Sequence, residues 1–414
     1  MKNATGIGMA LVGITLHAAP QIAQNSMTFV QNQQSRKVTI SYTLKNEPAI
    51  VTIDIQTNYT DGTEMKWASI GGGNLRSLSG AVNKIVDVLD EPSTVTWMPH
   101  KTWQGHQIEN GIRAVVSAWA ISEPPDYMVM SLMVPSNICY YADVDSLPYP
   151  ITDSRYRKDE MVMRKIPAAG VRWRMGRSPD EAENTSEIPH YVTLTNDYYI
   201  GVFEVTADQW HAVKGSYPAA FSPAASQDAG SRPVANVTYG EVRGNPLDGS
   251  EYEWPDKGHS VSIPSFMGKL RAYTGRMCDL PTDAQWEYAC RAGTGTARYS
   301  DGDITEIAWM ADNAQGYAHP VGLLKENAWG LYDMLGNVRE WCLDWYSTSG
   351  VYSDGSDSVE PTGPKNSVDG TKVRRGESFA IAVDNIRSAR RSGYDPNGCH
   401  ESIGLRVACP ILCD

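Results

Sequence analysis

Seven cysteines and eight histidines are the residues of this sequence with the most direct chemistry, because thiolates and imidazoles bind soft and borderline metals. The cysteines contain no Cys-x-x-Cys pair and no Cys/His zinc spacing, and no two histidines are three or four residues apart. We therefore assign no metal to them. If some cysteines form disulfides, their odd number leaves at least one thiol unpaired or pairing between molecules. The cysteines are Cys139, Cys278, Cys290, Cys342, Cys399, Cys409 and Cys413.

The charge balance restricts the class of partner. The chain has 414 residues with 48 acidic and 36 basic side chains, and its formal net charge is -12. A surface that follows nucleic-acid phosphates is basic, so this balance argues against a nucleic-acid partner. The 36 Gly, 24 Pro, 12 Trp and 21 Tyr are typical of a folded, loop-rich protein, and the length favours two domains.

The N-terminus has the order of a secretory signal: Lys2, a mostly apolar run over 7–16, and the small residues Ala18 and Ala19. We predict a signal peptide over 1–19 and an exported protein, in the periplasm, at the cell surface or secreted. A buried first strand is the alternative. The apolar run is too short to span a bilayer, and no later segment reaches about 18 consecutive apolar residues, so we predict no membrane span.

Residues 26–138 show the period-two alternation that is typical of half-buried strands. Short runs of this kind are separated by turn signals, among them the glycine triplet at 71–73 and the proline pair at 124–125. The pattern predicts a small all-β immunoglobulin-like or fibronectin-like sandwich. The triplet is interpreted as a turn and not a phosphate loop, because no Lys-Ser/Thr follows it. The clearest alternating set is Val38, Ile40, Tyr42 and Leu44.

Residues 139–155, with prolines among Asp and Ser, are predicted to be a linker. From 156 to 412 the pattern is mixed, with short strands, few helices and long Gly/Asn/Asp-rich loops, which predicts an α+β domain. One helix is well marked, because Thr282 and Gln285 form a capping box at its start. Its residues Trp286, Ala289 and Cys290 have helical spacing and are expected to face the core.

Six segments of this second domain, in order and at fitting separations, resemble the formylglycine-generating-enzyme family, also called the sulfatase-modifying-factor family. Together they span nearly all of 156–410. The resemblance implies a C-type-lectin-like fold with little regular secondary structure. The segments are Trp173-Arg174-Met175-Gly176 with Pro189-His190-Tyr191-Val192, 199–206 (YIGVFEVT), Arg232-Pro233-Val234, 280–293 (LPTDAQWEYACRAG), 327–341 (NAWGLYDMLGNVREW), and 375–387 followed by Ile403-Gly404-Leu405-Arg406.

The family's named activity is oxidation of a sulfatase cysteine to formylglycine by oxygen, with copper held between two cysteines, and soft thiolates suit Cu(I). In family enzymes these cysteines follow a Gly-Gly-Ser-aromatic stretch, but the corresponding residues 376–387 contain no sulfur. Arg339 is a second departure, because it stands where the family has a tryptophan. Ser378 matches the family's active-site serine, but without the cysteines we assign it no catalytic role. We expect no copper and no catalytic residues.

The resemblance also implies a calcium site at Asp333, Gly336, Val338 and Glu340. A hard cation takes oxygen ligands, and this loop could supply two carboxylates and the backbone carbonyls of Gly336 and Val338. The alternative is that the two carboxylates cap local turns without a metal.

The run 379–391 mixes apolar and charged residues on an expected surface loop of a rigid scaffold, where recognition concentrates. We predict that it forms, with Arg339 and Ser378, a groove for a protein, peptide or glycan ligand. The residues assigned to this ligand are Arg339, Ser378, Phe379, Ile381, Asp384, Asn385 and Arg387.

The first functional hypothesis is therefore an exported, non-catalytic binding module. Two alternatives stay open. One is a sulfatase activator with displaced catalytic residues, which conversion of a sulfatase-type Cys-x-Pro-x-Arg peptide would reveal. The other is a lectin-like binding protein diversified by a reverse-transcriptase cassette, which a template repeat in the neighbouring genome would reveal.

Overall fold

The structure is a computed structural model that describes residues 18–106, 111–179, 181–219, 221, 228–244, 260–347, 357–364 and 369–411. The chain divides into two compact units, one formed by residues up to Ile70 and Asn74–Ile121, the other by Gly71–Gly73 and the residues from Ser122 onward. Residues 1–17 of the predicted signal peptide lie outside the described residues. Within the described ranges, no helix has both the length and the apolar character needed to cross a bilayer.

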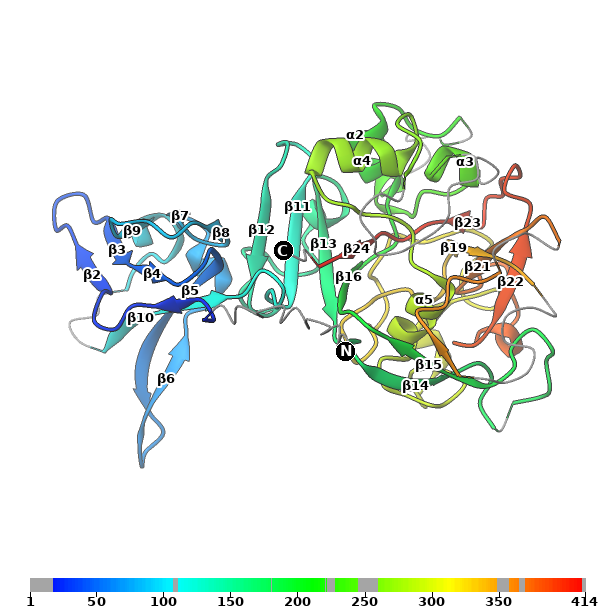
Figure 1. The fold of residues 1–414 in the computed structure, drawn as a ribbon, viewed down its shortest axis with the longest axis horizontal. Coiled ribbons are helices and arrows are strands. Elements are labelled where there is room, and N and C mark those ends of the chain that lie inside the picture. The colour runs from blue at the N-terminus through cyan, green and yellow to red at the C-terminus, as the bar shows by residue number, and fades with distance from the viewer. Residues whose placement is uncertain are drawn as a thin grey trace, which may run out of the picture. The chain divides into compact units, whose positions relative to one another are not determined.

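The first unit contains two antiparallel four-stranded sheets (Figure 1). One has the order β2-β3-β9-β7; in the other, β10, β5 and β6 are neighbours and β8 also pairs with β5. The strands are β1 Gln21–Ile22, β2 Thr28–Gln31, β3 Val38–Tyr42, β4 Leu44–Lys45, β5 Ala49–Thr60, β6 Met65–Ser69, β7 Ser79–Gly80, β8 Lys84–Val86, β9 Ser93–Trp97 and β10 Ile112–Trp119, and a short helix α1 covers Pro99–Thr102.

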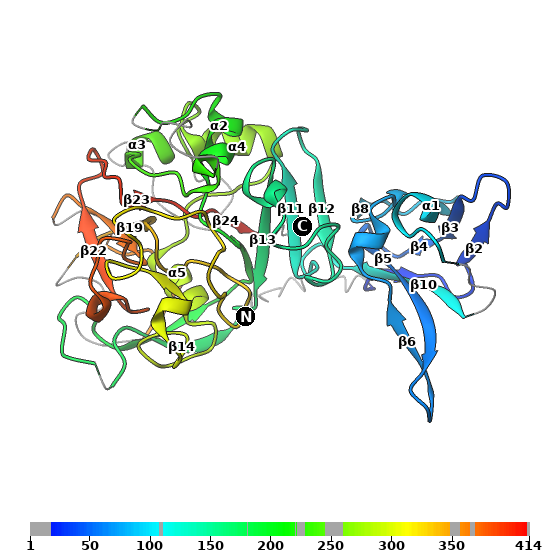
Figure 2. The same cartoon turned by 180° about the vertical axis from the view of Figure 1, so that it is seen from behind.

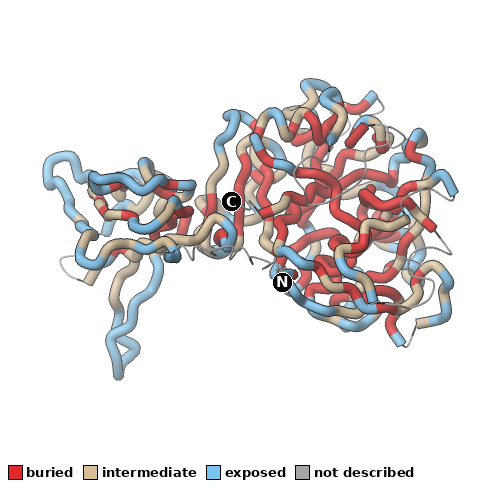
Figure 3. Tube along the Cα trace, in the orientation of Figure 1, coloured by how far each residue is buried: buried red, intermediate tan, exposed pale blue. Residues whose placement is uncertain are grey.

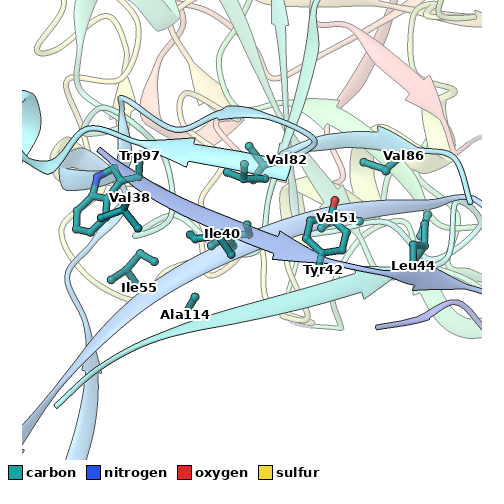
Figure 4. Packing of buried hydrophobic residues seen from close by; sticks show 13 residues of the cluster. Val38, Ile40, Tyr42, Leu44, Val51, Ile55, Val82, Val86, Trp97 and Ala114 are labelled. Atoms are coloured by element: carbon teal, nitrogen blue, oxygen red, sulfur yellow. The ribbon is translucent and has the colours of Figure 1, made fainter. Parts of the chain in front are cut away.

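Side chains from both sheets of this unit meet in one apolar core (Figure 4). In β3, alternate residues are buried, as the period-two pattern predicts, because successive side chains of a strand point to opposite faces. Val38, Ile40, Tyr42 and Leu44 are all at most 2% exposed. The all-β character of this unit is therefore as predicted, while its immunoglobulin-like topology stays a prediction.

The boundary between the units differs from the predicted one. The strand β11 (Tyr127–Ser131), expected in the first domain, pairs with β13 (Glu160–Ile166) in the second unit. The predicted linker 139–155 overlaps β12 (Ile138–Tyr141), which pairs with the other edge of β11, and contributes Leu147 to an apolar core. The division lies near Ile121 and not at 138, because alternation identifies a strand but not the sheet that it joins.

The second unit is an α+β structure of short strands, few helices and long connections (Figure 1). Its five-stranded sheet has the order β12-β11-β13-β16-β24, and a four-stranded sheet has the order β22-β21-β19-β23. The remaining strands are β14 Val171–Met175, β15 His190–Leu194, β16 Tyr198–Gly201, β17 Ala308–Trp309, β18 Leu335–Gly336, β19 Arg339–Trp345, β20 Ser358–Val359, β21 Lys372–Arg375, β22 Arg391–Tyr394, β23 Ile403–Gly404 and β24 Ala408–Pro410.

The helices of this unit are short and capped by hydroxyl side chains. In α5 the Thr282 hydroxyl accepts from the backbone of Gln285, whose side chain accepts from the backbone of Thr282, as the predicted capping box requires. Trp286, Ala289 and Cys290 of α5 are fully buried, as predicted. Figure 2 shows α2 and α4 side by side, and Trp210 of α2 stacks on Phe266 of α4. The helices are α2 Ala207–Lys214, α3 Tyr239–Val242, α4 Phe266–Thr274 and α5 Asp283–Arg291.

Buried ion pairs fasten α5 to the four-stranded sheet. The guanidinium of Arg375, fully buried at the end of β21, contacts the carboxylates of Asp283 and Glu287 on α5, and Arg391 of β22 lies 2.7 Å from Asp283. Figure 3 shows that much of the chain in the interior of this unit is buried. These paired, buried charges hold the end of β21 in place. Residues 376–379, which include Ser378, follow directly after it.

Candidate functional site

Three adjacent strands of the four-stranded sheet bring the candidate site together (Figure 1). Arg339 is the first residue of β19, whose next residue pairs with the last residue of β21, so Glu377 and Ser378 follow directly beside it. On the other side Arg339 pairs in parallel with Ile403 of β23, which places Ser402 next to it. The site is therefore built from segments that are far apart in sequence.

The guanidinium of Arg339 is the centre of this site. Its Nη2 lies 2.7 Å from the Glu377 carboxylate, and its Nη1 donates to the hydroxyls of Ser402 at 3.2 Å and Ser378 at 3.4 Å. Arg390 donates to the other oxygen of Glu377 at 3.2 Å. The Arg339 side chain is 13% exposed and that of Glu377 is 5% exposed, so this is a largely desolvated ion pair.

A pocket of about 580 Å³ adjoins this ion-pair network. His400 connects the two, because its Nδ1 lies 2.8 Å from the Ser402 hydroxyl while its backbone carbonyl accepts from the amide of Asn236 in the pocket wall. The wall combines small apolar side chains with a few polar and charged groups, the composition expected of a ligand site. Its residues are Phe221, Ala229, Arg232, Pro233, Ala235, Asn236, Ala318, Cys399, His400 and Glu401.

The structure divides the predicted ligand residues into three groups. Arg339 and Ser378 are in contact, and Ser378 and Phe379 are buried. Asp384 and Asn385 are exposed on a single 3-10 turn, Val383–Asn385, and Ile381 is half-buried. Arg387 points elsewhere: it forms ion pairs with Glu181 and Glu187. The predicted set is therefore not one surface.

The prediction missed the residues that complete the site. Glu377, Ser402 and His400 form the network, and the pocket adds Arg232 and Asn236. One signal was available in the sequence: Glu377 stands in the glycine position of the Gly-Gly-Ser stretch, and Arg339 stands in the tryptophan position of another motif. A new acid and a new base at two family positions indicate an ion pair.

The predicted calcium ligands are buried residues, and one of their two carboxylates, that of Glu340, is already paired with a cation. Both oxygens of Glu340 receive hydrogen bonds from Arg406, the shortest at 2.7 Å, and one also accepts from the Trp286 indole at 2.6 Å. The Asp333 carboxylate accepts from the backbone amide of Gly322 at 2.7 Å. Arg406 therefore supplies the positive charge that balances Glu340 in this arrangement.

A third buried carboxylate, Glu204, adjoins the same loop. It accepts from the side chain of Asn337 at 2.7 Å and from the amide of Val338 at 3.1 Å. Burial, together with the charges of Asp333 and Glu340, raises the pKa of Glu204 well above its usual value. Burial is also the main reason that the pKa of Asp333 is raised to about 6. These carboxylates hold their protons more tightly than exposed ones.

The described cysteines are thiols in this structure, and they do not gather at the site. Cys399 is exposed and lines the pocket, whereas Cys278, Cys290, Cys342 and Cys409 are fully buried. Cys413 lies outside the described residues. In the part of the chain that the structure describes, no group of three or more His, Cys, Asp or Glu side chains is placed to hold a metal ion. Residues 376–387 offer copper no sulfur ligand.

Comparison with known proteins decides the family. Residues 152–411, more than half of the chain, match the family described as "Sulfatase-modifying factor enzyme 1-like domain". The chain belongs to this family. Sulfatase-modifying-factor relatives include the formylglycine-generating enzyme of Streptomyces coelicolor, which is 34% identical over 147 residues, 31% of this chain and 46% of the relative. The chain therefore spans less than half the length of that enzyme.

The chain is also similar to proteins with other names. The chaperone protein LppX of Paenibacillus barcinonensis is 28% identical over 250 residues, which cover 52% of this chain and 81% of LppX. Among solved structures, Treponema denticola variable protein 1 is similar with a TM-score of 0.47 and 28% identity over 61% of this chain and 95% of that one. PvdO from Pseudomonas aeruginosa has a TM-score of 0.49 and 23% identity over 60% and 94%.

Proposed function

We propose that this protein is an exported, non-catalytic member of the sulfatase-modifying-factor family that binds a protein, peptide or glycan ligand in the pocket beside Arg339. The observation that carries the proposal is the ion pair between Arg339 and Glu377. This largely desolvated pair lies beside Ser378. Residues 376–387 contain no sulfur. Without thiolates this place lacks the soft ligands that Cu(I) favours, and the adjoining pocket remains for binding a ligand.

The pocket supports binding by its composition. Arg232 and Glu401 supply opposite charges, Asn236 and His400 supply hydrogen-bonding groups, and the alanines leave room between them. A pocket of about 580 Å³ accommodates a side chain or a single sugar with its neighbours, which is the scale of a peptide or glycan subsite. The relative LppX carries the name of a chaperone, and a chaperone binds protein segments without converting them.

A second candidate, sulfatase activation, rests on the formylglycine-generating enzymes among the relatives. It needs a thiol close to the reacting cysteine, and Cys399 is the described cysteine that lines the pocket. A single thiol does not make the two-coordinate sulfur site that Cu(I) favours, so we rank this candidate second.

One experiment separates the two functions. The full chain is mixed with a fluorescently labelled sulfatase-type Cys-x-Pro-x-Arg peptide, and binding is followed by anisotropy while mass spectrometry looks for the aldehyde. We expect binding without conversion, equal for the peptide with Ser in place of Cys. Formylglycine that disappears when copper is removed would establish the enzyme instead, and absence of binding would direct the search to glycans.

A pocket-filling variant tests where the ligand binds. Ala235→Trp places a large ring in the pocket and is expected to weaken binding at least tenfold, because the ring occupies the volume that the ligand needs. Ala169→Trp, at an exposed position of the same unit, is the matched control and should bind as the wild type does. Equal binding by both variants would place the ligand outside this pocket.

A further inference from the structure

Two cysteines that the proposed function does not use lie opposite each other in a small antiparallel ladder. Asp279 and Ala408 exchange both backbone hydrogen bonds, from the Asp279 amide to the Ala408 carbonyl at 2.8 Å and from the Ala408 amide to the Asp279 carbonyl at 2.7 Å. The residue before Asp279 is Cys278, and the residue after Ala408 is Cys409. Because the segments run antiparallel, these two cysteines are the next facing pair.

The position of this pair in the ladder matters for its chemistry. Directly beside a hydrogen-bonded pair comes a non-hydrogen-bonded pair, whose Cα atoms lie about 4.5 Å apart with both side chains on the same face. Disulfides join residues whose Cα atoms are roughly 4.4–6.8 Å apart. Cys278 and Cys409 therefore meet the backbone requirement for a disulfide without movement of either segment.

The two cysteines lie in a buried environment next to a methionine sulfur. Both cysteines are fully buried, and the Sγ of Cys278 lies 3.9 Å from the Sδ of Met130 on β11. The two thiols are hydrogen-bonded to each other. Burial raises the pKa of Cys278 well above its usual value, and the hydrogen bond from Cys278 lowers the pKa of Cys409.

We propose that Cys278 and Cys409 are a disulfide-forming pair that locks the C-terminal strand β24 onto the segment before α5. The reaction is a two-electron oxidation by a small disulfide such as oxidised glutathione. The Sγ–Sγ bond forms, the sulfur–sulfur bond of glutathione breaks, and the two thiol protons pass to the two glutathione thiols released. Because both thiols are buried in the folded chain, the exchange takes place before β24 docks.

The lock would act at one edge of the five-stranded sheet. In the order β12-β11-β13-β16-β24, β24 is an edge strand of only three residues, paired with β16 on one side. A bond between positions 278 and 409 closes a loop of about 130 residues, and closing a long loop removes much of the unfolded chain's entropy. Asp279, beside the bond, is itself fixed by ion pairs to Arg243 and Arg271.

Peptide mapping tests the bond in the full-length chain. The protein is unfolded, reduced and refolded in a buffer of reduced and oxidised glutathione, and its free thiols are alkylated with iodoacetamide in denaturant. Trypsin leaves Cys278 with Cys290 and Cys409 with Cys413, so Glu-C is added to cut after Glu287, and fragmentation distinguishes Cys409 from Cys413. We expect a Cys278–Cys409 linked peptide that disappears on reduction. Alkylation of both cysteines without reduction, or linkage of either to another cysteine, would overturn the proposal.

Thermal unfolding gives an independent readout. Dithiothreitol should lower the melting temperature of the refolded wild type by several degrees and leave that of the Cys278→Ala/Cys409→Ala variant unchanged. Cys342→Ala removes a buried thiol outside the pair and should respond to dithiothreitol as the wild type does. If the double variant does not fold, the peptide map of the wild type still decides. An equal response of wild type and folded double variant would refute the lock.

Discussion

The guanidinium of Arg339 and the carboxylate of Glu377 lie 2.7 Å apart, although the two residues are 38 positions apart in the chain. Both stand where the family pattern described in the sequence analysis has a different residue, a tryptophan and a glycine. The two departures are in contact with each other, as a base paired with an acid. This pairing explains how two charges are accommodated beside the buried Ser378.

The first prediction concerns this pair. Arg339→Trp alone leaves the Glu377 carboxylate buried with Arg390 as its remaining partner, and we expect it to lower the free energy of unfolding by about 2–4 kcal/mol. Arg339→Trp with Glu377→Gly restores both family residues and should recover most of this loss. Urea unfolding of the wild type, the Arg339→Trp and Glu377→Gly single variants and the double variant gives the coupling energy. Arg172→Ala, which breaks the exposed pair with Asp357, is the control and should leave the stability almost unchanged. A double variant as unstable as the worse single one would contradict the pairing.

The second prediction concerns the pH dependence of stability. Asp344 is fully buried, its Oδ2 accepts from the amide of Asp283, and its Oδ1 has no hydrogen-bond partner among the described residues. Burial and the neighbouring charge of Asp283 raise its pKa to about 7. The folded chain therefore binds this proton more tightly than the unfolded chain, whose carboxyl titrates near pH 4. The free energy of unfolding should fall as the pH rises from about 4 to about 7.

Asp344→Asn removes this titration. We expect the variant to gain roughly 2–4 kcal/mol relative to the wild type between pH 5 and pH 8, because the amide cannot ionise. Urea unfolding across this pH range measures it. Asp384→Asn, at an exposed position, should follow the wild-type curve. Parallel curves for Asp344→Asn and the wild type would mean that Asp344 does not carry the proton.

The third prediction concerns calcium. Because Arg406 already neutralises Glu340, we expect the melting temperature to be the same in excess EDTA and in millimolar calcium. Differential scanning fluorimetry measures the melting temperature in both buffers. A melting temperature that falls with EDTA, recovers with calcium and loses this response in Asp333→Ala would instead establish the calcium site implied by the family resemblance.

The fourth prediction concerns the start of α5, which anchors the buried ion pairs. Thr282→Ala removes the hydroxyl that accepts from the Gln285 amide, and should lower the free energy of unfolding by roughly 0.5–2 kcal/mol. Thr282→Ser keeps the hydroxyl and is the matched control. Equal stability of the Ala and Ser variants, measured by chemical denaturation, would show that the cap does not contribute.

The sequence by itself determined the local features of this protein. Alternation marked the buried face of β3, the capping box marked the start of α5, and six ordered segments marked the family, because each of these signals depends on neighbours within one element or on residue identity. The absence of sulfur in residues 376–387 is likewise a property of the sequence alone.

Only the tertiary structure decided which distant segments meet. Alternation did not say that β11 joins β13 and not the first unit, since a strand's pattern records burial but not its partner. The packing of distant segments likewise brought Glu377 and Ser402 to Arg339, Arg387 to Glu187, and Arg406 to Glu340. It also set Cys278 opposite Cys409. Such contacts depend on how segments separated by tens to hundreds of residues pack together, and no local pattern records that packing.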